Sequence, residues 1–179
     1  MDCRLRGYDD NLSFAKETGV VLRNFSWVIP GKVAGSAMPG GHSSQREYIL
    51  GDLAEMFDQG VRCLISLTRT HENFKTLCGE LTMEWIHFPI PDFMVPDNSR
   101  AFDVLVDQCI EMIKNGKPVC AHCHAGIGRT GMLLSCLVGK LLALDPEAAI
   151  KTVRQSRPAL DTPDQEAYVY RYLQEYGLQ

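Results

Sequence analysis

The segment from His122 to Gly131 combines a thiol, a guanidinium and glycines within one short stretch of chain. Gly126 and Gly128 permit unusual backbone dihedrals, so consecutive N–H groups can turn inward before a helix begins. Such N–H groups and a helix N-terminus bind an anion and favour the thiolate form of Cys123. Arg129 can hold two oxygens of a tetrahedral dianion through a trigonal transition state. The segment therefore predicts a nucleophile that acts on a phosphate-like group.

Two elements must position this segment: a strand before it and a helix after it. Residues 117–122 predict a short strand, and residues 129–143 are apolar nearly all round, as in a central helix. Another helix is predicted over residues 97–116, where apolar side chains form a single stripe. We expect Asp97 to cap the N-terminus of this helix and Gly116 to end it.

Turns and helix caps set the boundaries of the remaining elements. Asp145 and Thr162 are each followed by proline, which is typical of an N-cap and the first helical position, and Gln165 adds a capping-box residue. Together the elements predict a single α/β domain with a mainly parallel central sheet flanked by helices. The predicted strands cover residues 24–29, 32–35, 61–67 and 83–88, and the other predicted helices cover residues 48–57 and begin at residues 146 and 163.

Composition and charge exclude several classes of protein. The 179 residues are 45% hydrophobic and 22% charged, as in an ordinary globular domain. The net charge of −4 provides no broad basic surface, so we expect neither nucleic acid nor an anionic membrane as a partner. The seven scattered cysteines do not form a paired disulfide framework. We therefore expect a monomer in a reducing compartment, the cytoplasm, with entry into the nucleus left open, and no exported or membrane-spanning segment.

The motif His-Cys-x-x-Gly-x-x-Arg-Thr-Gly resembles the signature loop of cysteine-dependent protein tyrosine phosphatases, in the form typical of the dual-specificity branch. The likeness extends to small atypical dual-specificity phosphatases of the VHZ type. It implies a dual-specificity-phosphatase-like catalytic domain over residues 24–179, preceded by an N-terminal arm of unknown role over residues 1–23. The segments that carry the likeness are residues 24–31, 64–68, 90–93 and 157–165.

The resemblance implies a two-step hydrolysis that needs no metal ion or cofactor. Cys123 would attack phosphorus to form a cysteinyl-phosphate, while a carboxylic acid protonates the departing oxygen; its conjugate base would then activate water. Thr130 resembles the hydroxyl that stabilises the departing thiolate, and His122 the histidine that orients the cysteine. Charge on the transferring group would be met by Arg129 together with the phosphate-binding backbone of His124, Ala125, Gly126, Ile127 and Gly128.

Two aspartates in a proline-rich loop could be the acid. Asp97 stands at the N-terminus of the helix predicted over residues 97–116, where an aspartate is more often a cap than a catalyst. Asp92 has no such structural role and precedes the cysteine at about the spacing of the family's acid. Asp92 is therefore the predicted general acid.

Two further residues keep two interpretations each. Gln165 corresponds to a glutamine that can position the hydrolytic water, but capping of the last helix explains it equally well. Cys120 could form a protective disulfide with the nucleophile, although a small apolar residue in a buried strand is the simpler interpretation. Alternation along a strand would point the two thiols to opposite faces.

Other functions compete for the same residues. Cys120-x-x-Cys123-His124 matches a c-type haem attachment pattern, but no export signal accompanies it. A zinc site would need four converging ligands. A non-catalytic phosphate-binding module would be expected to lack the cysteine, the arginine or the acid. We therefore expect an enzyme with no metal site, hydrolysing phosphoprotein, with phosphotyrosine favoured and phosphoserine or phosphothreonine left open. Phosphoinositide-directed relatives tend to carry lysines where His124 and Ile127 stand, so phosphoinositide or another non-protein phosphate is the alternative substrate.

Overall fold

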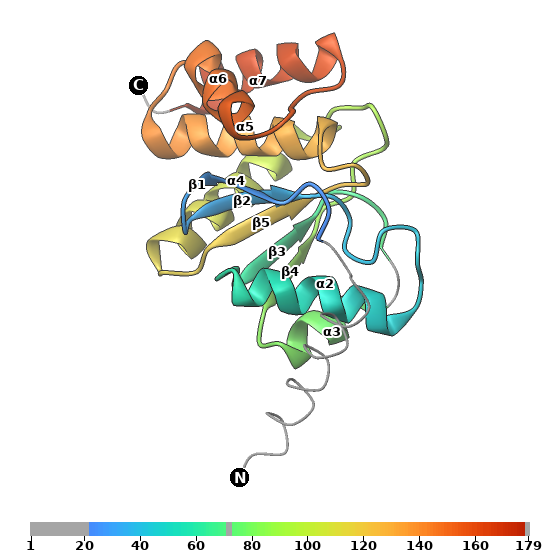
Figure 1. The fold of residues 1–179 in the computed structure, drawn as a ribbon. Helices are drawn as coiled ribbons and strands as arrows, with labels where there is room; N and C mark the ends of the chain where they lie inside the picture. The colour runs from blue at the N-terminus through green and yellow to red at the C-terminus, as the bar shows by residue number, and fades with distance from the viewer. Residues whose placement is uncertain (1–21, 71–72, 178–179) are drawn as a thin grey trace.

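A five-stranded sheet forms the centre of the computed structural model, which describes residues 22–70 and 73–177 (Figure 1). Most of the predicted N-terminal arm, residues 1–21, lies outside the described residues. The strand order is β1-β2-β5-β3-β4; β1 and β2 are antiparallel and the other neighbours are parallel. The strands are β1 (Ser26–Ile29), β2 (Val33–Ser36), β3 (Cys63–Ser66), β4 (Glu84–His87) and β5 (Val119–His122).

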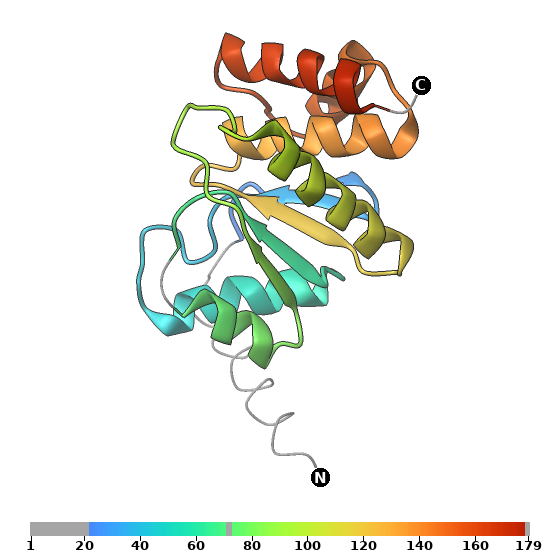
Figure 2. The same ribbon diagram turned by 180° about the vertical axis from the view of Figure 1, so that it is seen from behind.

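Helices cover both faces of this sheet, as Figures 1 and 2 show. Four of them pack on one face and two on the other, which confirms the predicted α/β architecture with a mainly parallel sheet. The first group comprises α4 (Ser99–Lys114), α5 (Gly128–Leu142), α6 (Pro146–Ser156) and α7 (Pro163–Tyr176), and the second comprises α2 (Arg46–Asp58) and α3 (Phe74–Glu80). No helix in the described part of the chain is long and apolar enough to cross a membrane.

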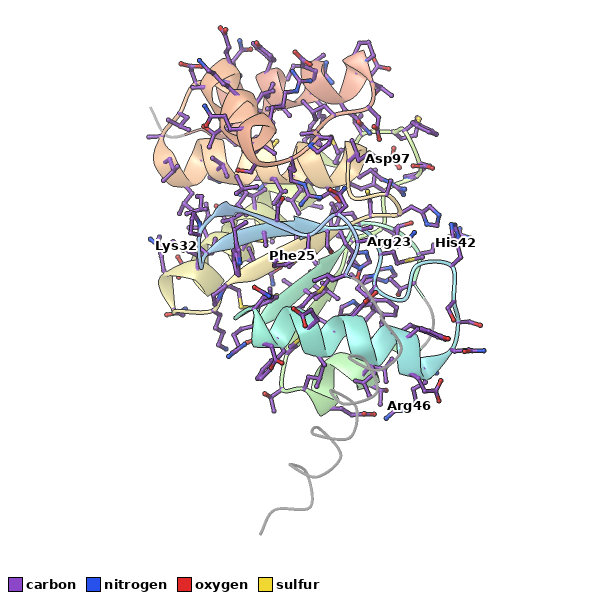
Figure 3. The ribbon with its side chains drawn as sticks, in the orientation of Figure 1. Arg23, Phe25, Lys32, His42, Arg46 and Asp97 are labelled. Atoms are coloured by element: carbon purple, nitrogen blue, oxygen red, sulfur yellow. The ribbon has the colours of Figure 1, made fainter. Side chains whose placement is uncertain are left out.

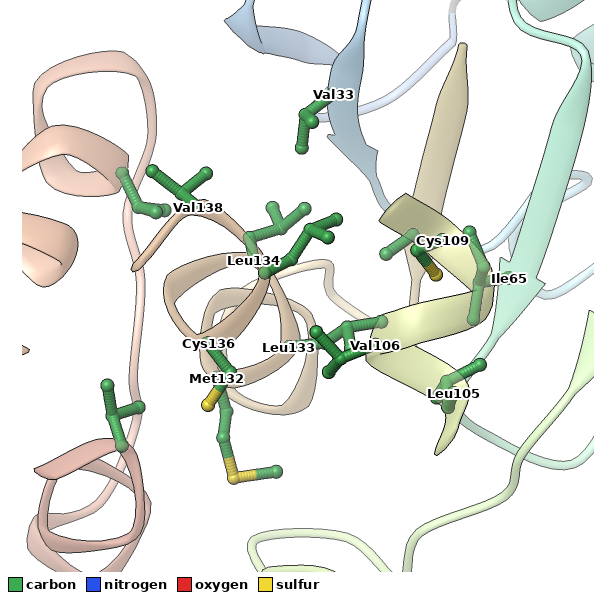
Figure 4. Close-up of a cluster of buried hydrophobic side chains, with 14 of the residues drawn as sticks. Val33, Ile65, Leu105, Val106, Cys109, Met132, Leu133, Leu134, Cys136 and Val138 are labelled. Carbon is green, nitrogen blue, oxygen red and sulfur yellow. The ribbon is translucent and has the colours of Figure 1, made fainter. Parts of the chain in front are cut away.

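The sheet divides the core into two clusters because successive strand residues point to opposite faces. On β5, Val119 and Ala121 belong to the larger cluster, whereas Cys120 belongs to the smaller one. Figure 4 shows Leu133 of α5 facing Val106 of α4 within the larger cluster. The helix that follows β5 is therefore buried between the sheet and the other helices, and this burial fixes the position of its N-terminus.

The N-cap residues of α6 and α7 are as predicted, but the capping-box contact expected of Gln165 is absent among the described residues and the N-cap of α4 is a different residue. Asp145 and Thr162 accept hydrogen bonds from the backbone N–H groups of Ala148 and Gln165. At α4 the cap is Asn98, whose side chain accepts from the N–H of Ala101 at 2.9 Å. The predicted cap at Asp97 is wrong by one residue, because the helix begins at Ser99 and Asp97 lies too far from the first turn.

Candidate active site

The segment predicted to bind an anion forms the turn between β5 and α5, at the carboxyl end of the central strand. Gly126 has a φ of +77°, in the left-handed region that favours glycine. A Cβ atom at this position would collide with the backbone carbonyl of Ser36. Glycine at 126 is therefore required by both the dihedral angle and the close approach of β2.

Three consecutive carbonyl groups of this turn point away from its centre. The carbonyl of His124 accepts from the N–H of Met38 at 3.1 Å, and that of Ala125 accepts from Asn24 Nδ2 at 2.9 Å. The carbonyl of Gly126 accepts from Arg157 Nη2 at 2.7 Å. The N–H of a trans peptide points opposite to its carbonyl, so the N–H groups of residues 125–127 face the centre. The turn thus has the inward-facing N–H groups that the sequence predicts for an anion cradle.

The nucleophile candidate lies at the base of this cradle. Cys123 is buried, with 3% of its surface exposed, and the N–H of Gly126 donates to its sulfur at 3.3 Å. The geometry therefore places a sulfur nucleophile where an anion bound by the cradle would meet it.

Arg157 binds the outer side of the cradle, a role that nothing in the sequence indicates apart from the place of this residue in the family resemblance. Its guanidinium is buried and donates to the carbonyls of Asn24 and Gly126 and to Ser26 Oγ. Within the described part of the chain it pairs with no carboxylate, and burial lowers the pKa of Arg157. A buried cation is thus bound to the outside of the turn whose N–H groups face inward.

His122 is held by a chain of hydrogen bonds that reaches across three strands. Its Nδ1 lies 3.0 Å from the carbonyl of Cys123, and its Nε2 lies 2.6 Å from Ser66 Oγ, which accepts from Trp85 Nε1 at 2.8 Å. Burial lowers the pKa of His122 to about 4, so the ring is neutral at neutral pH. Because a carbonyl only accepts, Nδ1 carries the proton and Nε2 accepts from the hydroxyl of Ser66.

This neutral, buried imidazole makes stability depend on pH. The unfolded chain protonates His122 as the pH falls through about 6.5, whereas the folded protein leaves it neutral until about pH 4. Stability is therefore unaffected above the unfolded pKa and is lost as the pH falls between these values, by up to about 3 kcal/mol. Urea unfolding between pH 7.5 and 4, compared with the same series for His122→Asn, measures this loss, because the carboxylates common to both proteins cancel. An identical pH dependence in the two proteins would contradict it.

Arg129 closes the other side of the site. It is 4% exposed, and its Nη1 donates to the carbonyl of Ile90 at 2.9 Å and to Thr68 Oγ1 at 3.2 Å. Its Nη2 forms an ion pair with Asp92 Oδ1 at 2.7 Å. Of the two aspartates considered for the acid, Asp92 is therefore the one in contact with the arginine, while Asp97 lies before α4 (Figure 3).

Two polar side chains of the predicted site are fully buried beside the cradle. Thr130 lies in the first turn of α5, and within the described residues its hydroxyl makes no hydrogen bond. Gln165 accepts from the N–H of Asp161 through Oε1, rather than from the Thr162 N–H of a capping box, and its Nε2 lies 3.5 Å from the carbonyl of Met94. Its amide also packs closely against Gly128 at the start of α5. Gln165 thus links α7 to the loop that carries Asp92.

Cys120 lies in a different environment from Cys123. It belongs to the cluster on the opposite face of the sheet, its sulfur lies 3.6 Å from Ser36 Oγ, and burial raises the pKa of its thiol to about 11. A disulfide with Cys123 would require the end of β5 to rearrange. The geometry supports the packing interpretation of Cys120 and offers no support for the redox interpretation.

A pocket of about 570 Å³ opens above the cradle. It brings together the arginine, the aspartate paired with it and the first side chain of the cradle, with walls from the loops that follow β3 and β4. The lining residues are Thr68, Arg69, Pro89, Ile90, Pro91, Asp92, His124 and Arg129.

A family model and curated relatives match the part of the chain that contains most of this site. The family model described as "Polymorphic toxin system, DSP-PTPase phosphatase" matches residues 35–140. A protein of Invertebrate iridescent virus 3 that carries a tyrosine phosphatase name, 067L, is 28% identical over 72% of this chain and 54% of its own length. Tyrosine-protein phosphatase cdc-14 of Caenorhabditis elegans is 29% identical over 82% of this chain and 21% of its own length. The chain spans about half or less of the curated relatives that it matches first.

Solved structures agree with the fold. The active form of Tk-PTP is 25% identical to this chain, with a TM-score of 0.70, over 85% of this chain and 97% of its own. Kinase associated phosphatase, in a form whose catalytic site cysteine is replaced by serine, has a TM-score of 0.72 at 21% identity, over 87% of this chain and 97% of its own. With its signature loop and parallel sheet, the chain belongs to the dual-specificity branch of the cysteine-dependent protein tyrosine phosphatase family.

Proposed function

We propose that this protein hydrolyses phosphomonoesters of phosphoprotein through a cysteinyl-phosphate intermediate. The observation that carries the proposal is the arrangement of Cys123 and Arg129 around one cradle. The cysteine sulfur accepts from the N–H of Gly126 at 3.3 Å, while Arg129 contacts Asp92 at 2.7 Å in the pocket above. A nucleophile, an anion cradle and an acid are the parts that phosphoryl transfer to a thiol requires.

In the first step the sulfur of Cys123 attacks phosphorus as the bond to the leaving oxygen breaks. The cradle N–H groups and Arg129 hold the equatorial oxygens of the phosphoryl group and neutralise their charge. Asp92 gives its proton to the leaving oxygen, so the alcohol or phenol departs neutral. In the second step the Asp92 carboxylate takes a proton from water, which attacks phosphorus and releases Cys123 as thiolate.

Three buried side chains support these steps in the proposed mechanism. The unpartnered hydroxyl of Thr130 can donate to the departing thiolate, because nothing else among the described residues binds it. His122 holds the carbonyl of Cys123 and so orients the loop. Gln165 reaches the Asp92 loop and the start of α5, a position from which its amide can orient the attacking water.

The substrate class follows from the residues that line the cradle. His124 and Ile127 supply no ammonium group there, whereas a polyanionic head group would call for added positive charge. An aryl phosphate has the better leaving group, so phosphotyrosine is favoured over phosphothreonine or phosphoserine. Phosphoinositide remains the second candidate, because PTPMT1, which shares this fold at 17% identity, has been solved in complex with PI(5)P.

The proposed domain boundaries, oligomeric state and cellular location are those that the sequence predicts. Residues 24–179 form the catalytic domain, which acts as a monomer on phosphoprotein in the cytoplasm, with entry into the nucleus left open. The six cysteines in the described part of the chain are all free thiols, in keeping with a reducing compartment. The roles of the nucleophile and arginine require no metal ion or cofactor.

A substrate panel tests this function. The specificity constant kcat/KM is measured on one peptide carrying phosphotyrosine or phosphothreonine and on a phosphoinositide, with Cys123→Ser protein as the blank. We expect the phosphotyrosine peptide to be the best substrate, because phenolate leaves more readily than alkoxide. A best rate on the phosphoinositide would favour the second candidate, and no release above the blank from any substrate would reject catalysis.

A further inference from the structure

One wall of the pocket mouth carries a positive charge, that of Arg69, which the proposed chemistry does not use. Arg69 follows β3 and lines the pocket together with Arg129, with its side chain exposed. Within residues 22–70 and 73–177 it forms no ion pair, whereas Arg129 is already paired with Asp92. An unpaired guanidinium that lines a pocket attracts an anion brought by the ligand.

Two histidines extend this wall at the surface. The rings of His124, in the cradle, and His42, in the loop between β2 and α2, meet edge to face with 5.0 Å between centroids. Both residues are exposed. The His42 loop is tied to the cradle through the hydrogen bond from Met38 N–H to the carbonyl of His124. Imidazole N–H groups at this rim add hydrogen-bond donors beside the arginine.

We propose that Arg69, with the two histidines at the rim, binds a second anionic group of the substrate. The preferred substrate is then a phosphotyrosine peptide with an acidic side chain next to the phosphorylated residue. This proposal rests on the proposed function and specifies the substrate of the same site. Asp92 is the one carboxylate among the described residues that line the pocket; it pairs with Arg129, so no described lining residue compensates the charge of Arg69.

The size of the pocket and the exposed apolar residues that follow Asp92 favour a peptide over a compact head group. A pocket of about 570 Å³ is in the range that holds a drug-sized ligand, so it has room beyond a single phosphate. Directly after Asp92, Phe93 and Met94 are 60% and 54% exposed. Phe93 is held there with a φ of +60°, an uncommon conformation for a residue other than glycine. Exposed apolar side chains directly after Asp92 and an arginine in the pocket lining suit a peptide chain that carries both kinds of side chain.

The test compares two phosphotyrosine peptides that differ only in glutamate or glutamine at the positions flanking the phosphotyrosine. We expect wild-type kcat/KM to be about fivefold higher for the glutamate peptide at low ionic strength, and the ratio to fall towards one in Arg69→Ala. In Arg69→Glu the ratio is expected to invert. The matched control is Lys32→Ala, which removes the same charge at the opposite end of the molecule from His42 (Figure 3) and is expected to keep the wild-type ratio.

The outcomes separate the proposal from the function on which it depends. If wild-type protein turns over p-nitrophenyl phosphate but shows no preference for the glutamate peptide, or if Arg69→Ala keeps the preference, the second anion site is rejected and the phosphatase function stands. If p-nitrophenyl phosphate itself is not hydrolysed, both are rejected. If Lys32→Ala loses the preference for the glutamate peptide equally, the preference arises from the net charge of the protein. That outcome would also reject the second anion site.

Discussion

Replacing Cys123 by serine is expected to lower kcat on aryl phosphates by a factor on the order of 10⁴ or more. A serine hydroxyl must lose its proton to attack phosphorus, and Asp92 cannot take that proton because it acts as the acid in the first step. His122 cannot serve, because its Nδ1 proton is bound to the carbonyl of residue 123 and its Nε2 accepts from Ser66. Sulfur is also a far better nucleophile than a neutral hydroxyl, so the change removes the attacking group itself.

Phosphate binding should survive the same change. The cradle amides and Arg129 are unaltered by Cys123→Ser, so inorganic phosphate should raise the melting temperature of the variant as it does that of wild type. Cys120→Ser is the matched control, because this thiol lies on the other face of the sheet. Comparable loss of turnover in both variants, or loss of phosphate binding in Cys123→Ser, would mean that the cysteine supports the loop rather than attacking phosphorus.

The sequence predicts those parts of the site that depend only on residues close together in the chain. Gly126 and Gly128 lie within a few residues of the thiol and the guanidinium, so one short segment contains the whole cradle. The N-caps at Asp145 and Thr162 are equally local, because each is followed directly by proline. At α4, Asp97 and Asn98 are both residue types that suit an N-cap, and the helix begins directly after Asn98.

The remaining parts depend on contacts between distant segments. Asn24 and Arg157 bind the carbonyls of Ala125 and Gly126 from 101 and 31 residues away, and Ser66 reaches His122 across 56 residues. Only the strand order, which places β5 between β2 and β3, brings such segments together. Helix α3, from Phe74 to Glu80, was missed because a helix of 7 residues shows too little periodicity to be detected.

Replacing Asp92 by asparagine is expected to lower kcat by about 10²- to 10³-fold on substrates with poor leaving groups. The amide cannot give a proton to the departing oxygen, so the phenolate must leave charged. The decrease should be much smaller with 2,4-dinitrophenyl phosphate, whose leaving group needs no proton. Since only a protonated Asp92 acts as the acid, wild-type kcat should fall as the pH rises, and this alkaline limb should be absent in Asp92→Asn.

The ion pair between Asp92 and Arg129 adds a second, opposite effect on binding. In the free protein the Asp92 carboxylate lies 2.7 Å from Arg129 Nη2, in the place where a substrate phosphate must bind the arginine. Removing the carboxylate charge frees the guanidinium, so KM should fall together with kcat in Asp92→Asn. Asp97→Asn, which alters a residue outside both the pocket and the α4 cap, should leave kcat, KM and the alkaline limb as in wild type. If Asp97→Asn instead loses the limb and Asp92→Asn keeps it, Asp97 is the acid and the contact between Asp92 and Arg129 is structural.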